Sequence, residues 1–267
     1  MTKELKGVYA VAVTPFQKDG SFDIEHAKKH LDWLLDHGIK GLCILGATGE
    51  YQSVTNEEHK AYVKEIVPYV KERAAVLVGV SRERPEEVVE LMQNAKDAGA
   101  DGAMALSPFY CHPDQNEIVA YYQYLNDHVD LPFIIYNNPG SAGVDFTAET
   151  YQKLLHLKNA RFVKESTGDI RRLTEVLLGA PEDVTVLCGC DNLAYESFAA
   201  GAQGWISMAA NFAPEDCIAL YESVALHSDR KKGLALYRKL LPALNTLESF
   251  PKPVQAIKYI LKEVKVM

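Results

Sequence analysis

A short apolar run in the second half of the chain reads Arg161-Phe162-Val163-Lys164-Glu165 and passes directly into Ser166-Thr167-Gly168-Asp169. Near-continuous apolar runs of this length are typical of strands that are buried on both faces of a parallel sheet. Lys164 would then close a buried strand. Burial disfavours the charged form of a lysine and lowers its pKa, and a neutral amine attacks carbonyl carbons. The alternative is an exposed lysine at a strand end, and this run alone does not separate the two.

The composition bounds the class of protein. The chain has 267 residues, of which 48% are hydrophobic and 24% charged, and its net charge is −8. These values suit one large globular domain or at most two small ones. The acidic balance argues against a nucleic-acid binder. No apolar stretch reaches the roughly 18 residues that span a bilayer, and residues 1–6 run into a strand rather than a signal-peptide core. We therefore expect a cytoplasmic protein with no membrane partner.

The cysteines and histidines form no metal or redox motif. No CxxC pair occurs among Cys43, Cys111, Cys188, Cys190 and Cys217. We interpret the close pair Cys188-Gly-Cys190 as small residues at a strand end. His26 and His30 stand four residues apart without an HExxH pattern, so we expect both on a solvated helix surface. The sequence therefore predicts no metal site.

Eight apolar runs alternate with amphipathic segments. The expected strands are residues 8–13, 42–45, 75–80, 102–106, 132–136, 161–165, 184–188 and 203–207. The segments between them have apolar residues at helical spacing, as in 23–37, or helix-start signals such as the capping-box pattern at 55–58. Eight βα units predict a (β/α)8 TIM barrel over residues 1–213. Three further helices, near 214–226, 229–247 and 253–264, predict a C-terminal helical extension over 214–267 that packs on the barrel.

A doubly wound open sheet is the structural alternative. That fold usually has a glycine-rich phosphate loop after its first strand. Here the position reads Thr14-Pro15-Phe16, which has no glycine. The barrel is therefore favoured.

The ends of two neighbouring strands pair a lysine with a tyrosine. In a TIM barrel the active site lies at the carboxyl ends of the strands, and adjacent strands lie about 4.8 Å apart. If Tyr136 and Lys164 both point inward, the phenol can reach a carbonyl carbon bonded to Lys164. This combines a nucleophile with a proton-transfer group. The alternative is a core tyrosine, but Tyr136 leaves its strand into a tight Asn-Asn-Pro-Gly turn rather than a helix, which favours a functional role.

A small-residue loop follows the second expected strand and reads Gly46-Ala47-Thr48-Gly49-Glu50. Its glycines let the backbone approach a ligand closely, and its amides together with the Thr48 hydroxyl suit a carboxylate. Alone this motif is weak, since such turns are common. With Tyr136 and Lys164 it becomes specific.

Together the three motifs resemble the dihydrodipicolinate synthase / N-acetylneuraminate lyase superfamily of class I, pyruvate-type aldolases. The matching patterns are Gly-x-Thr-Gly-Glu at 46–50, Tyr-Asn-x-Pro at 136–139 and Val-Lys-Glu-x-Thr-Gly at 163–168. The resemblance covers essentially the whole chain. It implies a Schiff-base-forming lyase, an aldolase or dehydratase, that acts on pyruvate or another 2-oxo acid such as a 2-keto-3-deoxy sugar acid. It also implies no metal, no organic cofactor and a homotetramer built from dimers.

The resemblance implies a role for each matching residue. Lys164 forms the Schiff base with the ketone, and Tyr136 relays protons. Tyr110 matches the tyrosine that members lend to a neighbouring subunit's proton relay. The carboxylate of the 2-oxo acid binds at Ala47 and Thr48. Two further positions, Gly189 and Ile206, line the pocket.

Two positions depart from the lysine-biosynthesis branch of the family. Ala47 replaces a threonine whose hydroxyl links the two tyrosines, so the relay is broken or bridged by water. Ser141 replaces an arginine that grips the second substrate's carboxylate, and serine cannot substitute for its fork. We therefore expect poor activity with aspartate semialdehyde. The chain also ends at Met267, about one helix short of usual members, so it is expected to be truncated or naturally short.

Three alternatives stay open from the sequence. The first is synthase activity proper, in which pyruvate condenses with aspartate semialdehyde. The second is a barrel that binds 2-oxo acids but has lost turnover, as Ala47 suggests. The third is an oxidoreductase, for which the segment 201–204 is too weak a phosphate site. The sequence does not choose the distal half of the substrate, nor between aldolase, dehydratase and deaminase chemistry.

Overall fold

The barrel predicted from the alternating pattern is present. The computed structural model describes residues 5–267 and contains eight parallel strands closed in the order β1 to β8. The strands are β1 (Gly7–Val11), β2 (Gly41–Ile44), β3 (Ala75–Gly79), β4 (Gly102–Leu106), β5 (Phe133–Asn137), β6 (Ala160–Glu165), β7 (Thr185–Cys188) and β8 (Gly204–Ser207). Each of the eight expected strands is confirmed, and β1 pairs with both β2 and β8 to close the sheet.

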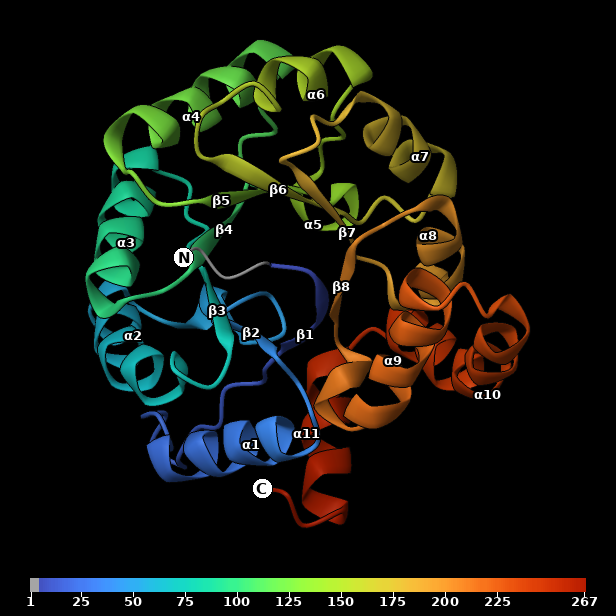
Figure 1. Cartoon of the computed structure of the whole chain (residues 1–267). Coiled ribbons are helices and arrows are strands. Elements are labelled where there is room, and N and C mark those ends of the chain that lie inside the picture. Colours follow the sequence, from blue (N-terminus) through green and yellow to red (C-terminus); the bar gives the residue numbers. More distant parts are fainter. Residues whose placement is uncertain (1–4) are drawn as a thin grey trace.

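A ring of helices surrounds the strands (Figure 1). It consists of α1 (Ile24–Asp36), α2 (Asn56–Val70), α3 (Pro85–Ala98), α4 (Gln115–His128), α6 (Ala148–Leu154), α7 (Ile170–Gly179), α8 (Ala194–Ala200) and α9 (Pro214–Tyr221). Helix starts follow the expected signals: Thr55 and Glu58 form a capping box before α2, and a proline opens α3. The glycines after α1, α3 and α8 have positive φ, as helix ends require.

The two faces of the sheet explain the near-continuous apolar strands. Side chains such as Tyr9, Leu77 and Ile134 fill the barrel interior and form one buried cluster. Their outward neighbours pack under the helices in a second, larger cluster. Both faces are dry, so the hydrophobic effect selects apolar residues at successive positions rather than at alternate ones.

The C-terminal helices contact the mouth of the barrel as well as its wall. The π-helical turn η4 (Glu222–Leu226) ends the segment of α9, so the single helix expected over 214–226 is divided. Next, α10 (Arg230–Ser249) packs on α9 and on the 3₁₀ turn η2 (Asp191–Leu193), and α11 (Pro253–Glu263) packs on η3 (Ala209–Asn211). In Figure 1, α10 lies outside α8 and α9, and α11 lies beside α1. The division at residue 213 stays a prediction.

Two local expectations are wrong. The tight turn after β5 is a four-residue helix, α5 (Pro139–Ala142), because Pro139 starts it and the Asn138 side chain accepts a hydrogen bond from the Ser141 amide. His26 is exposed as expected, but His30 is fully buried on α1. Helix α1 turns His30 toward the barrel. His26, four residues earlier, lies at the edge of the apolar stripe of the helix and stays exposed, so this spacing did not give the two histidines the same environment.

The buried histidines predict acid lability. Burial lowers the pKa of His30 and of His59 to about 4. The unfolded chain has its histidine pKa near 6.5, so it binds more protons than the folded chain between pH 6.5 and 4. Stability is therefore fully present above pH 6.5 and falls as the pH approaches 4, by roughly 2–4 kcal/mol for each histidine.

Urea unfolding at pH 7.5, 6 and 5 checks this expectation. His30→Leu removes one titrating group, so its free energy of unfolding should fall less steeply with pH than that of the wild type. The exposed His156 offers a control, since His156→Gln should leave the wild-type slope unchanged. Equal slopes for His30→Leu and the wild type would contradict the argument.

No helix in the described residues combines the length and apolar character needed to cross a membrane.

Candidate active site

Lys164 and Tyr136 meet inside the barrel, as their strand parity predicted. They are direct partners in the register of β5 and β6, and each is about 5% exposed. The Lys164 Nζ lies 4.2 Å from the centroid of the Tyr136 ring. The Tyr136 hydroxyl accepts a hydrogen bond of 2.8 Å from Asn138 Nδ2. This bond fixes the phenol and leaves its proton free to be donated. The pair can therefore serve as a nucleophile with an adjacent proton donor.

The predicted direction of the Lys164 pKa is wrong. Burial acts to lower it, but Tyr136, Cys43 and Cys190 act in the opposite direction, and the net pKa is raised above its ordinary value. The face of the Tyr136 ring also favours a cation at this distance. The resting side chain is consequently an ammonium at neutral pH, and it must lose a proton before it can attack a ketone.

This raised pKa predicts how imine formation depends on pH. The free-amine fraction of Lys164 grows about tenfold for each pH unit below the pKa, so the rate of imine formation should rise steadily from pH 6 to pH 9. Quenched-flow trapping of [¹⁴C]pyruvate by borohydride, with the trap mixed after a variable delay, measures that rate. A rate that is flat over this range would show that the amine is already neutral.

The backbone at Gly189 forms one wall of the space around Lys164. A Cβ placed on Gly189 would lie 1.9 Å from Ser166 Oγ, 2.7 Å from the Glu165 carbonyl oxygen and 3.0 Å from Lys164 Cγ. Only glycine permits this approach of the strand ends. Ile206, the other predicted lining residue, is buried in the same interior cluster as Tyr136. Both predicted positions therefore lie at the barrel interior.

A buried carboxylate behind Lys164 was missed from the sequence. Glu165 points out of the barrel and is 3% exposed. It accepts hydrogen bonds from the Tyr151 hydroxyl (2.5 Å), from Asn137 Nδ2 (3.2 Å) and from the Thr167 amide (2.7 Å). These bonds join the ends of β5 and β6 to α6 and to the loop after β6. A charged residue ending an apolar strand was the available signal, since buried carboxylates need such partners.

The loop after β2 is held from both sides. The Thr14 hydroxyl donates a 2.8 Å hydrogen bond to the Gly49 carbonyl, and Glu50, which has a φ of 59°, pairs with Lys258 of α11. Thr48 is 5% exposed and Ala47 is partly buried. The Thr48 hydroxyl makes no hydrogen bond with another described residue. It is available to a ligand, although its role there stays a prediction.

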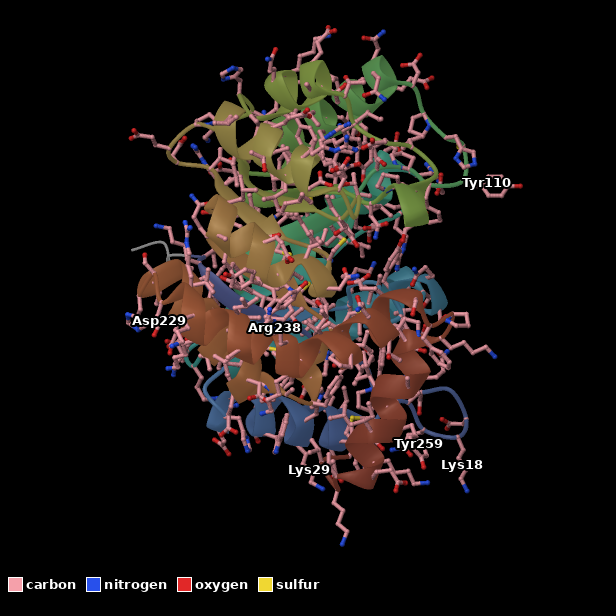
Figure 2. All side chains as sticks on the ribbon, turned by 90° about the vertical axis from the view of Figure 1, so that its right-hand side faces the viewer. Lys18, Lys29, Tyr110, Asp229, Arg238 and Tyr259 are labelled. Atoms are coloured by element: carbon pink, nitrogen blue, oxygen red, sulfur yellow. The ribbon has the colours of Figure 1, made fainter. Side chains whose placement is uncertain are left out.

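Tyr110 is not brought to Lys164. Its side chain is 83% exposed and stands out from the edge of the molecule in Figure 2. Its backbone amide and that of Phe109 both donate 3.0 Å hydrogen bonds to Glu83 Oε1. Glu83 was not singled out in the sequence, and it fixes the loop that presents Tyr110. A tyrosine so displayed cannot serve the lysine of its own barrel in this conformation.

The loop of α5 offers hydroxyl and amide groups at the mouth. Ser141 is exposed, and no basic residue occurs in 140–143. A Cβ on Gly143 would lie 2.2 Å from the His112 ring, so this loop packs closely on the loop after β4. Among residues 5–267, no group of three or more His, Cys, Asp or Glu side chains is placed to hold a metal ion.

Comparisons with known proteins agree with this geometry. The family model described as the dihydrodipicolinate synthetase family matches residues 4–267. This chain belongs to that family. The 4-hydroxy-tetrahydrodipicolinate synthase of Bartonella bacilliformis is 36% identical over 261 residues, which cover 97% of this chain and 88% of the relative. The synthase of Moorella thermoacetica is 34% identical and covers 93% of this chain and 85% of the relative.

Solved structures of dihydrodipicolinate synthetase family members superimpose over nearly the whole chain. A chloride-inhibited dihydrodipicolinate synthase from Acinetobacter baumannii, complexed with pyruvate, has a TM-score of 0.92 and 32% identity, covering 99% of this chain and 90% of its own. A prophage protein of the family from E. coli K12, also in complex with pyruvate, has a TM-score of 0.91 and 28% identity, covering 96% and 87%. The chain is therefore a Schiff-base-forming lyase of this family.

Proposed function

We propose that Lys164 is the Schiff-base lysine. The substrate is a 2-oxo acid with a hydroxylated distal half, such as a 2-keto-3-deoxy sugar acid. The enzyme cleaves or dehydrates this substrate through an enamine of the pyruvate type. The observation that carries the proposal is the buried Lys164 amine placed 4.2 Å from the Tyr136 ring inside the barrel. The pyruvate complexes of two family members support a 2-oxo acid as ligand.

The first steps follow from that geometry. The deprotonated Lys164 amine adds to the ketone carbon, and the carbonyl oxygen becomes a hydroxyl of the carbinolamine. Tyr136 donates its proton as this hydroxyl leaves as water, and the nitrogen lone pair forms the iminium. In cleavage, the C4 hydroxyl gives its proton to the Tyr136 phenolate as the C3–C4 bond breaks; the aldehyde leaves, and the electron pair of that bond passes to the iminium and gives an enamine. In dehydration, C3 loses a proton to the Tyr136 phenolate, and the resulting enamine expels the C4 hydroxyl, which takes a proton from Tyr136 and leaves as water. After cleavage the enamine is protonated at C3, and on both routes hydrolysis of the iminium then frees Lys164 and releases pyruvate or the dehydrated 2-oxo acid.

The carboxylate of the 2-oxo acid binds, in this proposal, to the loop after β2. Thr48 offers a hydroxyl without a partner among the described residues, and the backbone amides near Ala47 and Thr48 add donors. Gly189 and Ile206 then limit the space beside the reacting carbon. Because Ala47 has no hydroxyl, the Tyr136 proton has no side-chain path at that point, and water is the carrier we infer.

The distal half of the substrate meets a mouth without an arginine. Ser141 of α5 is exposed, and a serine hydroxyl binds a carboxylate less strongly than a guanidinium fork does. A substrate that ends in hydroxyl groups fits this edge better than one that ends in a carboxylate. The relatives named 4-hydroxy-tetrahydrodipicolinate synthase nevertheless favour a second candidate, condensation of pyruvate with aspartate semialdehyde.

Trapping and a substrate panel test the proposal. Borohydride with pyruvate should add the mass of a reduced adduct to the peptide that contains Lys164. Turnover should then be compared on 2-keto-3-deoxygluconate, 4-hydroxy-2-oxoglutarate, N-acetylneuraminate, and pyruvate with aspartate semialdehyde. We expect the sugar acid to be the best substrate. Fast condensation with aspartate semialdehyde would contradict the assignment, and an adduct without turnover on any of the four would indicate a binding protein.

The assembly is proposed to be a homotetramer formed from two dimers. Support comes from Tyr110, which extends beyond its own barrel on a loop fixed by Glu83. An exposed aromatic ring of this size leaves apolar surface in contact with water, which is unfavourable. A second copy of the chain would cover the ring, and the Tyr110 hydroxyl would then be available to the active site of that copy.

A further inference from the structure

The last turn of α10 brings a carboxylate to the barrel mouth. Glu248 Oε1 accepts a 2.5 Å hydrogen bond from the amide of Asp191, the first residue of η2. Asp191 lies two residues beyond Gly189, where an added Cβ would lie 3.0 Å from Lys164 Cγ, so Gly189 stands beside the Lys164 side chain. A residue from outside the eight βα units is thus fixed beside the strand end that forms the wall around the reactive lysine.

The charges around Glu248 agree with this placement. Burial raises the pKa of Glu248, while the Asp191 amide and the Lys164 charge act in the opposite direction. The negative charge of Glu248 in turn helps to raise the pKa of Cys190 and, after burial, that of Asp191 to about 7. Glu248, Cys190 and Lys164 therefore share one electrostatic environment at the carboxyl end of β7.

One oxygen of Glu248 remains available. Oε1 is bound to the Asp191 amide, whereas Oε2 makes no hydrogen bond with any residue in the described range 5–267. The residue as a whole is exposed, although its carboxyl group is desolvated enough to raise its pKa, so the free oxygen meets solvent or substrate rather than protein. Asp191 itself is not available, because it is buried and accepts hydrogen bonds from Trp205 Nε1 and from the amides of Met208 and Ala209.

The Glu248 carboxylate at the barrel mouth favours substrates with hydroxyl groups over substrates with a second carboxylate. It accepts hydrogen bonds from hydroxyl groups, and it repels a substrate carboxylate. Ser141, in the short helix α5 at the mouth, contributes a hydroxyl and no positive charge. The mouth therefore offers an acceptor and a neutral donor to the part of the substrate that lies beyond the reacting carbon.

We propose that Glu248 is a specificity-determining residue that binds hydroxyl groups on the distal half of a 2-keto-3-deoxy sugar acid and disfavours 2-oxo acids with a distal carboxylate. This rests on the proposed function, since it presumes that Lys164 forms the imine. It assigns substrate choice to the C-terminal extension rather than to the barrel.

The variant Glu248→Gln tests the proposal without breaking the contact to η2, because the glutamine carbonyl can still accept the Asp191 amide proton. With 2-keto-3-deoxygluconate, kcat/KM should fall about 10- to 100-fold, mostly through KM, since a hydrogen bond to a charged group is lost. With 4-hydroxy-2-oxoglutarate, kcat/KM should stay equal or rise. Pyruvate should still be trapped to completion on Lys164, at a rate no lower than that of the wild type, because removing a nearby negative charge favours the neutral amine.

Two further variants and the trapping assay separate the outcomes. Glu248→Asp should recover part of the lost specificity, and Glu263→Gln on the exposed face of α11 should behave as the wild type. An equal loss on both substrates, or no change on either, would overturn the role of Glu248. Failure of the wild type to trap pyruvate would instead refute the proposed function.

Discussion

Replacing Lys164 by methionine is expected to lower kcat/KM by at least about 10⁴-fold on any substrate of this protein, because it removes the only group that the mechanism uses as a nucleophile. Methionine has nearly the same length and is apolar, so the buried site around Tyr136 should remain filled. The free energy of unfolding should stay equal or increase, since a buried ammonium is replaced by an apolar side chain.

Two measurements check the Lys164 prediction. Mass spectrometry after borohydride treatment with pyruvate should show no adduct on Lys164→Met, and thermal unfolding should show an intact fold. Lys153→Met is the matched control, because Lys153 is half exposed and pairs with Glu149 on the surface of α6. An adduct that persists in Lys164→Met would mean that another amine does the chemistry.

Tyr136→Phe is expected to lower kcat by about 10²- to 10⁴-fold, the usual range for loss of a proton-transfer group. The ring that lies over Lys164 is kept, so trapping of pyruvate should still reach completion, but slowly. Stability should change by only about 0.5–1.5 kcal/mol, because the hydroxyl accepts one hydrogen bond, from Asn138.

Stopped-flow rates of imine formation, compared with steady-state turnover, distinguish the role of the Tyr136 hydroxyl in imine formation from its role in the later proton transfers. Tyr259→Phe provides the control, since Tyr259 is 64% exposed on α11, far from the catalytic pair in sequence. If Tyr136→Phe turned over substrate at the wild-type rate, proton transfer would have to come from elsewhere, and the pairing of Tyr136 with Lys164 would be structural.

The barrel and its central pair were predictable because both depend on local rules. Apolar runs of strand length, separated by helical patterns, specify eight βα units whatever the details of packing. Strand parity places Tyr136 and Lys164 on one face, and the register between β5 and β6 then makes them neighbours. Such reasoning needs only the sequence period and the order of the strands.

The errors came from contacts between distant segments. The pKa of Lys164 depends on Tyr136, Cys43 and Cys190, which three other strand ends supply, and burial alone gave the wrong direction. His30 was assigned to the surface because its neighbours in sequence are charged, although the helix turns it inward. Glu165 and Glu248 were missed because their partners come from other segments, Asn137 and Tyr151 for one and η2 for the other. No short-range pattern records contacts of this kind.

The ion pair between Lys258 and Glu50 means that α11 does more than cover apolar surface, because it also holds a loop at the barrel mouth. This bond reaches the loop that follows β2, while the preceding helix reaches the loop that follows β7. Two separate parts of the rim of the mouth are thereby braced by a segment that carries none of the reacting groups. Substitutions in that segment could retune what the enzyme accepts while the chemistry beneath stays intact, so selectivity and reactivity are free to evolve separately.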